Sequence, residues 1–473
     1  MATCGVHFFL IVMNWQLVRT TKMKKLEQNE QGSRSIQAGT RQDITATAGE
    51  ILSDGTVLEL VWSDLLHTNL NLLVYKSGNP IITPFFEHSG KIYAPPIVDQ
   101  TILRAIQFPS GVKSFGSVRE LFDDAAHSLA RKHDLPEEFI RLTTYFNFAT
   151  WVPERLPSAP LLSIVAPAPA PSELLMQDLA NFCRRPLLLS DPSAADLLAL
   201  PFDLRPTLLL HVSHARPDLQ TQLCASLRRR FFFAKRSRAV DLFGPKVVCS
   251  RLPLKEVSRN GAAIEIALNP TRRQTPFVDP DSSDKLAADF QSRFLSYRLQ
   301  ALRLAHAPQI DCEDLSNPMA TLAQALANGI VGDKDLQRQI VPLLRRQDRE
   351  FQVDVAASMK CIVVEALLTL CHDGYRQTFV CLELAQVVNT ILKGRGENLQ
   401  VSPEDIGWDL KSLGFHTEPI GRRGKGLKLT DSIRKIIHEL AVTCGVRSLQ
   451  GGAVAKCRHC SEPHAQQAEE RET

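Results

Sequence analysis

The sequence predicts an α/β fold organised around residues 160–250, because three apolar runs and one helical pattern follow each other there. The runs cover residues 161–165, 207–212 and 246–250, and short apolar runs bounded by turn residues are typical of strands. Between the first two runs, Leu175, Leu179, Phe182 and Cys183 recur at helical spacing. Strand, short loop, helix and further strands in this order form the skeleton of a phosphate-binding α/β domain.

Length and composition indicate a soluble, multidomain protein. The chain has 473 residues, enough for two or three domains, with 44% hydrophobic and 22% charged residues. The net charge is only +4, so binding to nucleic acid requires local clusters of basic residues. The eleven cysteines are scattered and mostly lie in apolar runs, as expected for reduced thiols in a cytoplasmic protein.

The first residues do not match a transmembrane or secretory segment. The apolar run 6–15 is shorter than the ~20 residues that span a bilayer, and its basic residues follow it instead of preceding it. A true start at Met13 or Met23 explains this run as well as a membrane anchor does. We expect a cytoplasmic protein with no membrane partner.

Shifts in pattern divide the chain into six parts. We expect a disordered segment at 1–49, a small β-rich module at 50–114, an α/β core at 115–282, a helical connector or lid at 283–371, a C-terminal module at 372–446 and a disordered tail at 447–473.

The loop after the first strand lacks what a phosphate site needs. Such a loop uses glycines to turn its N–H groups inward, a lysine for the phosphates and a hydroxyl for magnesium. Here Pro167, Pro169 and Pro171 have no N–H to donate, and Ser172 and Glu173 stand at the lysine and hydroxyl positions. Ser172 is predicted to cap the following helix, and Glu173 would repel a phosphate.

The second strand ends without the acidic residues that hold a metal and polarise water. His211 and Val212 stand there, and the next carboxylate along the chain is Asp218. His211 and His214 have a spacing compatible with two metal ligands, but no third ligand is visible; the alternative is two ordinary histidines.

The motifs around these strands resemble the helicase-type P-loop ATPase domain of bacterial and mobile-element primase–helicase-like proteins. The resemblance covers about residues 115–275 and is carried by 183–189, 204–209, 241–247 and 252–259. It implies a P-loop NTPase-like core of the RecA/AAA type with a helical lid and ATP-driven DNA unwinding. By this resemblance, the family's glycine-rich loop corresponds to residues 166–173, and its acidic pair corresponds to His211 and Val212. The family's arginine that acts on a neighbouring subunit corresponds to Arg259.

Every residue that this activity requires is replaced. The altered nucleotide-site positions are Ala166, Pro169, Pro171, Ser172, Glu173, His211 and Val212, beside a retained Arg259. We therefore predict a pseudo-ATPase with no catalytic residues, no cofactor and no metal.

A basic and aromatic segment separates the second and third strands. Residues 227–238 contain six basic residues and three phenylalanines without an acid, a composition suited to tracking a nucleic-acid backbone and stacking on bases. The DNA-binding candidates here are Arg228, Arg229, Arg230, Lys235 and Arg236. The alternative is a phenylalanine face in the core with a solvated arginine edge.

The C-terminal module, 372–446, resembles a winged helix. Residues 382–392 and 402–413 are predicted helices, and 417–429 a hairpin whose tip carries Arg422, Arg423 and Lys425 as DNA-binding candidates. The second helix is acidic, which is unfavourable for reading the major groove, so a protein contact stays open. Cys457 and Cys460 in the tail supply two zinc ligands, with disorder as the alternative.

These patterns lead to one functional hypothesis with two rivals. The hypothesis is a catalytically inactive helicase-like protein that binds DNA or a replication partner, possible homo-oligomers included, in the replication of a bacterial chromosome or mobile element. The first rival is a winged-helix transcriptional regulator whose core supports oligomerisation. The second is an active ATPase with a non-standard loop.

Overall fold

The computed structural model describes most of the chain beyond residue 43. The described residues are 44–63, 70–76, 78–166, 169–200, 202–235, 238–254, 257, 263–268, 280–304, 308–372, 376–397 and 399–446. The apolar run 6–15, the tail cysteines Cys457 and Cys460, Arg236 and Arg259 lie outside them. None of the described helices has the length and apolar character needed to cross a membrane.

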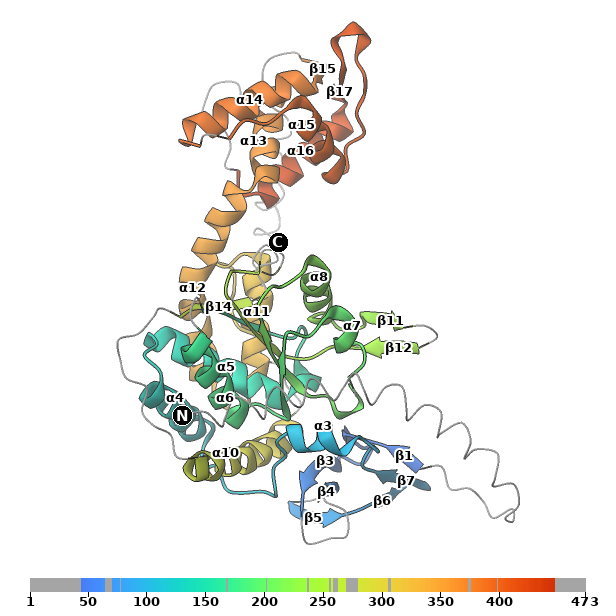
Figure 1. Ribbon diagram of the computed structural model, residues 1–473, viewed down its shortest axis with the longest axis vertical. Coiled ribbons are helices and arrows are strands. Elements are labelled where there is room, and N and C mark those ends of the chain that lie inside the picture. The colour runs from blue at the N-terminus through green and yellow to red at the C-terminus, as the bar shows by residue number, and fades with distance from the viewer. Residues whose placement is uncertain are drawn as a thin grey trace, which may run out of the picture.

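A five-stranded parallel sheet forms the centre of the molecule and confirms the predicted α/β core (Figure 1). Its strands are β8 (Leu161–Val165), β9 (Pro186–Ser190), β10 (Thr207–Val212), β13 (Lys246–Ser250) and β14 (Ala263–Ala267). The spatial order is β14-β8-β13-β10-β9, and every neighbouring pair is parallel. The first strand therefore lies between the last two, and chain order reverses beside β8, where ligands of such sheets usually bind.

Helices and the N-terminal module bury the two faces of this sheet. Leu162 and Ile164 of β8 belong to one core with α5 (Glu137–Trp151), α6 (Pro169–Phe182) and α10 (Pro280–Ala301), while Leu161 belongs to another with α8 (Pro217–Ser226). Strands covered on both faces read as continuous apolar runs, which is why the sequence located them. The short helices α7 (Ala194–Leu197), η1 (Pro153–Arg155) and η2 (Phe202–Leu204) connect these elements.

The N-terminal module is β-rich, as expected, and begins within the segment predicted to be disordered. Its elements are β1 (Ile44–Ala46), β2 (Gly49–Ile51), β3 (Val57–Trp62), β4 (Leu70–Lys76), β5 (Asn79–Thr83), β6 (Phe86–His88), β7 (Lys91–Ala94) and α3 (Gln100–Ala105). They form a four-stranded antiparallel sheet, β2-β3-β4-β5, and a three-stranded one, β1-β7-β6. Strand pairing with β3 and β7 explains why residues 44–51 are ordered.

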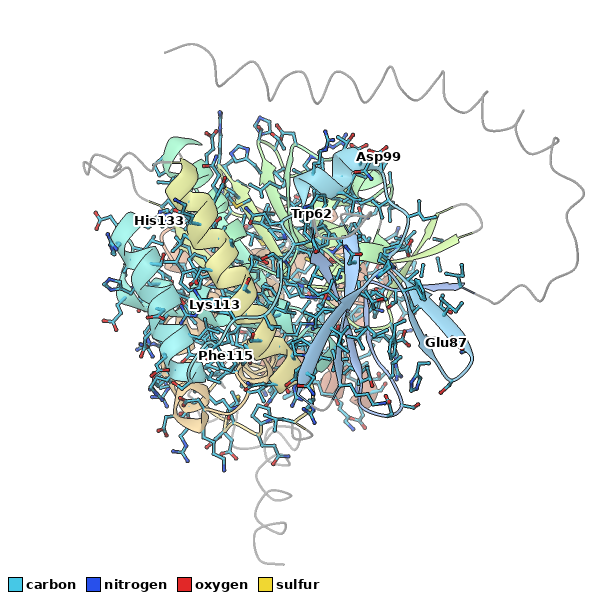
Figure 2. The ribbon with its side chains drawn as sticks, turned by 90° about the horizontal axis from the view of Figure 1, so that it is seen from below. Trp62, Glu87, Asp99, Lys113, Phe115 and His133 are labelled. Carbon is cyan, nitrogen blue, oxygen red and sulfur yellow. The ribbon has the colours of Figure 1, made fainter. Side chains whose placement is uncertain are left out.

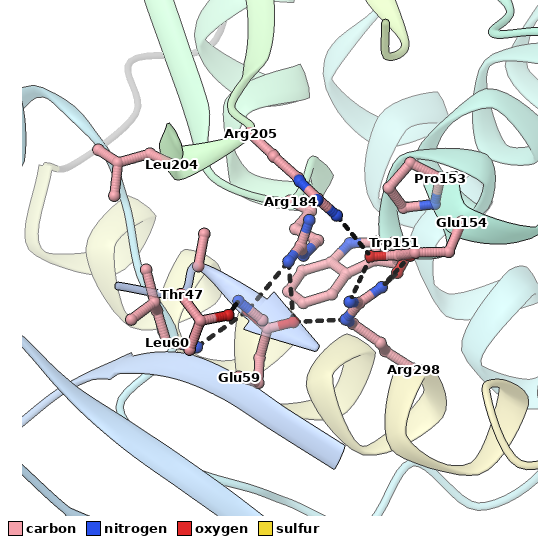
Figure 3. A network of polar contacts seen from close by, with 12 residues as sticks. Thr47, Glu59, Leu60, Trp151, Pro153, Glu154, Arg184, Leu204, Arg205 and Arg298 are labelled. Atoms are coloured by element: carbon pink, nitrogen blue, oxygen red, sulfur yellow. Dashed lines mark hydrogen bonds and ion pairs between the residues drawn. The ribbon is translucent and has the colours of Figure 1, made fainter. Parts of the chain in front are cut away.

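Buried charges join this module to the core (Figure 3). Glu59 on β3 is 1% exposed and accepts hydrogen bonds from Arg184, and it also forms ion pairs with Arg185 and Arg298. Arg298 on α10 reaches in addition to Glu154, at 2.8 Å to each carboxylate oxygen. Buried charges persist only when they are paired and hydrogen-bonded, so this network fixes the module on the core.

The linker after the module packs on α10. The backbone N–H of Lys113 donates to the Ser296 hydroxyl at 3.1 Å, and Phe115 meets Tyr297 edge-on, with ring centroids 6.0 Å apart. Figure 2 shows Lys113 and Phe115 beside this helix, next to which α4 (Val118–Lys132) also lies. Helices α11 (Asn317–Gly329) and α12 (Lys334–Ala357) complete the helical layer.

The C-terminal module has its own core at the end of the long helix α12 (Figure 1). It comprises α13 (Met359–His372), β15 (Thr378–Val380), α14 (Cys381–Gly394), α15 (Pro403–Ser412), β16 (Glu418–Pro419), η3 (Gly421–Arg423), β17 (Lys425–Lys428) and α16 (Asp431–Thr443). Helix α13 was expected in the connector, yet Ile362, Val363 and Leu367 pack in this core. The module therefore begins near Met359 and not at residue 372.

Candidate nucleic-acid interface

Most of the segment that would form a phosphate-binding loop after β8, residues 166–173, belongs to helix α6. Strand β8 ends at Val165 and α6 begins at Pro169, so only residues 166–168 lie between them, and Ala166 is bonded through its N–H to the Ser250 carbonyl. Ser172 was predicted to cap this helix, and that prediction is wrong. Proline is favourable in a first helical turn because its fixed φ fits and its missing N–H has no partner there, so the helix starts three residues earlier.

Ser172 faces the sheet and not an open site. It is 0% exposed, and its hydroxyl hydrogen-bonds to the Cys249 thiol of β13. Burial raises the pKa of Cys249, and the nearby Glu173 carboxylate raises it further. Glu173 itself is exposed, in the second turn of α6. The two positions that would bind phosphate and magnesium are thus a buried hydroxyl and a free negative charge, which repels phosphate.

A carboxylate that the sequence reading missed lies at the same edge of the sheet. Asp191 follows β9, and its backbone N–H donates to the His211 carbonyl at 2.7 Å. Its carboxylate accepts hydrogen bonds from the Ser213 N–H and hydroxyl at 2.6 and 2.9 Å. The pairing of Ser190 with His211 brings these residues together, a relation that depends on strand order. The Asp191 carboxylate is therefore hydrogen-bonded to the residue that follows β10.

The two histidines of this edge lie at the end of β10 and beyond it. His211 is the second-to-last residue of the strand, before the buried Val212, and His214 follows the strand. Among the residues that the structure describes, no group of three or more histidines, cysteines or acids is placed to hold a metal ion.

The basic segment forms a hairpin that projects from the core (Figure 1). Strands β11 (Phe232–Lys235) and β12 (Arg238–Asp241) pair antiparallel with Phe232 opposite Asp241 and Lys235 opposite Arg238. Phe231 and Phe232 are 50% and 60% exposed, so the phenylalanines do not form the core face that was the alternative. The Arg228 guanidinium lies 5.8 Å from the Phe231 ring centroid, a cation–π distance.

The three arginines before the hairpin have different roles. Arg229 donates to the carbonyls of Leu156, Pro153 and Glu154 at 2.5, 2.6 and 2.7 Å, and its guanidinium lies 4.6 Å from the Phe243 ring centroid. Burial lowers the pKa of Arg229. Arg228 and Arg230 are exposed and form no ion pair with any described residue. Arg229 thus anchors the hairpin, whereas Arg228 and Arg230 are available to a ligand; Lys235 lies on β11 and its side chain is outside the description.

A cavity of about 1180 Å³ lies beside the hairpin at the amino end of the sheet. Lys246, the first residue of β13, borders it; its Nζ donates to the carbonyls of Leu242 and Gly244 at 2.7 Å each, and burial lowers its pKa to about 7. The charged residues lining the cavity are Arg205, Arg229, Lys246, Arg298, Glu50, Glu154, Asp203 and Asp241. Since cations and anions are equal in number, the lining gives no preference for an anionic ligand.

The three DNA-binding candidates of the C-terminal module lie between β16 and the start of β17, with Arg422 and Arg423 in the turn and Lys425 as the first residue of β17. Arg423 donates to Glu383 at 2.8 Å, so its charge is partly offset, while Arg422 and Lys425 are exposed. Gly421 and Gly424 have φ values of 56° and 114°, which the turn requires and side chains disfavour. Helix α15, the candidate for a DNA-recognition helix, carries Glu404 and Asp405 in its first turn and is acidic, as the sequence indicated.

Comparisons with known proteins give only distant matches. No protein-family model and no curated protein matches the chain. Among solved structures, the A form apo structure of the NrS-1 C-terminal region is 11% identical, with a TM-score of 0.33, covering 78% of this chain and 96% of that one. A structure of Drosophila ORC bound to DNA is 10% identical, with a TM-score of 0.16, covering 73% and 95%. Scores this low do not establish a common fold.

Proposed function

We propose that this chain is a nucleic-acid-binding scaffold built on a P-loop NTPase-like core that does not hydrolyse nucleotides. The observation that carries the proposal is the projecting hairpin, where exposed Phe231 and Phe232 adjoin exposed Arg228 and Arg230. Aromatic faces stack on bases of any sequence, and arginines neutralise phosphates, so this combination suits single-stranded nucleic acid. Large aromatic side chains exposed on a protruding element otherwise cost solubility.

The absence of ATP chemistry is supported by the geometry at the carboxyl edge. Helix α6 begins at Pro169 and replaces the turn that would surround a phosphate, Ser172 is buried, and Asp191 is bonded to Ser213. A hydrolytic site needs N–H donors, a lysine and a metal-binding carboxylate directed at one point. The resemblance of the core motifs to primase–helicase-like proteins favours a role in replication, with α10–α12 as the lid or connector.

A second candidate places the nucleic-acid contact on the C-terminal module. The order α13, β15, α14, α15, β16, β17, α16 with the antiparallel sheet β15-β17-β16 supports the proposal that this module is a winged helix. In this reading, Arg422 and Lys425 contact the phosphate backbone, and the α/β core supports oligomers of a regulator. The exposure of these two residues on the β16–β17 turn favours it.

Fluorescence anisotropy with a labelled single-stranded oligonucleotide and the matching duplex separates the two candidates. We expect Arg228→Glu/Arg230→Glu to weaken single-strand binding by about 30-fold or more and to reduce the slope against log salt by about one to two. The control Arg338→Glu/Arg345→Glu changes the charge equally at exposed positions of α12 and leaves binding unchanged. Loss of binding only in Arg422→Glu/Lys425→Glu supports the second candidate, in which the C-terminal module binds nucleic acid. Unchanged binding in the hairpin variant and in the turn variant contradicts both candidates.

A further inference from the structure

Helix α15 and the β16–β17 turn border a groove of about 610 Å³ that the hairpin-based proposal does not use. Two large apolar side chains stand open on it: Trp408 is 71% exposed and Leu382 is 52% exposed. Helix α15 buries only Ile406 and Leu410 on its other face, so Trp408 takes no part in the module's core. Exposed aromatic residues grouped at a groove are typical of interaction surfaces.

Gly407 widens the groove. It lies in the middle of α15 and lines the groove, and a Cβ built at this position meets no atom within 4 Å. Its missing side chain therefore leaves open space beside Trp408, which a larger side chain at this position would occupy.

The charges around the groove select the kind of ligand. Lys411, Arg423 and Lys425 line it beside the carboxylate of Glu404, and the Lys411 ammonium lies 5.6 Å from the Trp408 ring centroid. Because Arg423 is paired with Glu383 at 2.8 Å, Lys411 and Lys425 carry most of the positive charge of the groove. A ligand that fits has negative charges near these cations and an apolar part for the tryptophan.

An acidic peptide meets this description better than a nucleic acid. Glu404 and Asp405 occupy the N-terminus of α15, where a phosphate would otherwise bind to free N–H groups. Asp405 is held there by the Ser402 hydroxyl at 2.8 Å and the Ser402 N–H at 3.1 Å, and these hydrogen bonds lower its pKa. The carboxylates therefore repel a phosphate backbone at one end of the groove, whereas a peptide can place its own acidic residues at the other end.

We propose that this groove docks a partner protein through a short acidic segment with one bulky apolar side chain. The apolar side chain packs over Gly407 between Trp408 and Leu382, and flanking aspartates or glutamates meet Lys411, Arg423 and Lys425. This inference does not depend on the hairpin-based proposal, since Arg228 and Arg230 belong to another part of the chain, and it competes with the second candidate for Lys425.

Selection from a displayed library of random peptides of about 12 residues on the full-length chain tests the proposal, with Gly407→Leu as the counter-selection target. We expect the enriched peptides to carry a bulky apolar residue among several acids. Their affinity should fall about tenfold or more in Gly407→Leu and Trp408→Ala, and severalfold in Lys411→Glu. The matched controls Val442→Ala and Lys435→Glu alter exposed positions on α16 and should leave binding unchanged.

Folding does not confuse the result, because leucine is a better helix former than glycine and Trp408 is exposed. The proposal is overturned if no peptide survives counter-selection, or if the enriched peptides have no excess of acids. It is also overturned if Gly407→Leu weakens oligonucleotide binding and leaves peptide binding unchanged, since the groove would then be a nucleic-acid site.

Discussion

The Arg184 guanidinium donates from one nitrogen to both carboxylate oxygens of Glu59, at 3.1 and 2.9 Å, across 125 residues of sequence. Both side chains are almost completely buried, and the pKa of Arg184 lies well below its usual range because burial disfavours its charge. Arg185 and Arg298 contact the same carboxylate. The N-terminal module is therefore joined to the core by an ion cluster that neither part can leave without exposing unpaired buried charge.

Glu59→Ala should destabilise the protein strongly. Removing one partner of a buried ion pair typically costs about 3–5 kcal/mol, and here three arginines lose their common acceptor. Urea unfolding followed by circular dichroism measures the change. The control Glu87→Ala, at an exposed position of β6, should change the free energy of unfolding by less than about 0.5 kcal/mol. Equal stabilities of the two variants would show that the module does not depend on this cluster.

The sequence located the central strands but not this cluster. Residues 161–165, 207–212 and 246–250 were predicted as strands and are strands, because runs covered on both faces must be apolar throughout. Glu59 interrupts a similar run, and nothing local indicates that its partners lie 125 and 239 residues away. Asp191 was missed for the same reason, since it meets Ser213 only through the pairing of β9 with β10.

The local sequence gave a wrong helix start at Ser172 and no indication that Trp408 is exposed. The Ser172 side chain, followed by an acid, fits a helix cap, but the prolines before it fit the first turn of α6 better. The exposure of Trp408 cannot be read from periodicity, because a tryptophan in a predicted helix is ordinarily assigned to its buried face. The basic and aromatic composition of residues 227–238 was visible in the sequence, but the hairpin that they form and the separate role of Arg229 were not.

Arg229→Ala should lower stability by about 1–3 kcal/mol, since three backbone carbonyls lose a charged donor. Arg228→Ala, one residue earlier and exposed, should stay within about 0.5 kcal/mol of the unmodified protein while weakening oligonucleotide binding. Thermal unfolding and anisotropy on the same samples check both expectations. A reversed pattern, with Arg228 needed for stability and Arg229 dispensable, would contradict the anchoring role.

Lys246 should make stability depend on pH. Burial lowers the pKa of its ammonium to about 7, whereas an unfolded lysine titrates near ~10.4. Between these pH values the unfolded chain binds more protons than the folded protein, so the free energy of unfolding rises with pH. Below about pH 7 the folded protein bears the full cost of burying a charged ammonium. Lys246→Met should lose this rise, and the exposed control Lys435→Met should keep it. Urea titrations between pH 7 and about 9 decide the matter; an unchanged pH slope in Lys246→Met would refute it.

Restoring a lysine at the phosphate-loop position should damage the fold without creating a nucleotide site. Ser172→Lys forces a long charged side chain into a fully buried position against β13 and should cost about 3 kcal/mol or more. Glu173→Lys, at the exposed neighbour in the second turn of α6, should change the free energy of unfolding by no more than about 0.5 kcal/mol. A stable Ser172→Lys protein that gains ATP binding would mean that α6 unwinds to form a phosphate loop.

The central claim, a core that keeps the strands and helix of a phosphate-binding fold without its chemistry, is tested most directly by equilibrium binding of a fluorescent ATP analogue. Titration of the full-length chain in the presence of magnesium should give no saturable signal, since Pro169 to Pro171 occupy the first turn of α6 and Ser172 is buried. Saturable binding that unlabelled ATP displaces, and that weakens in Asp191→Asn, would contradict it.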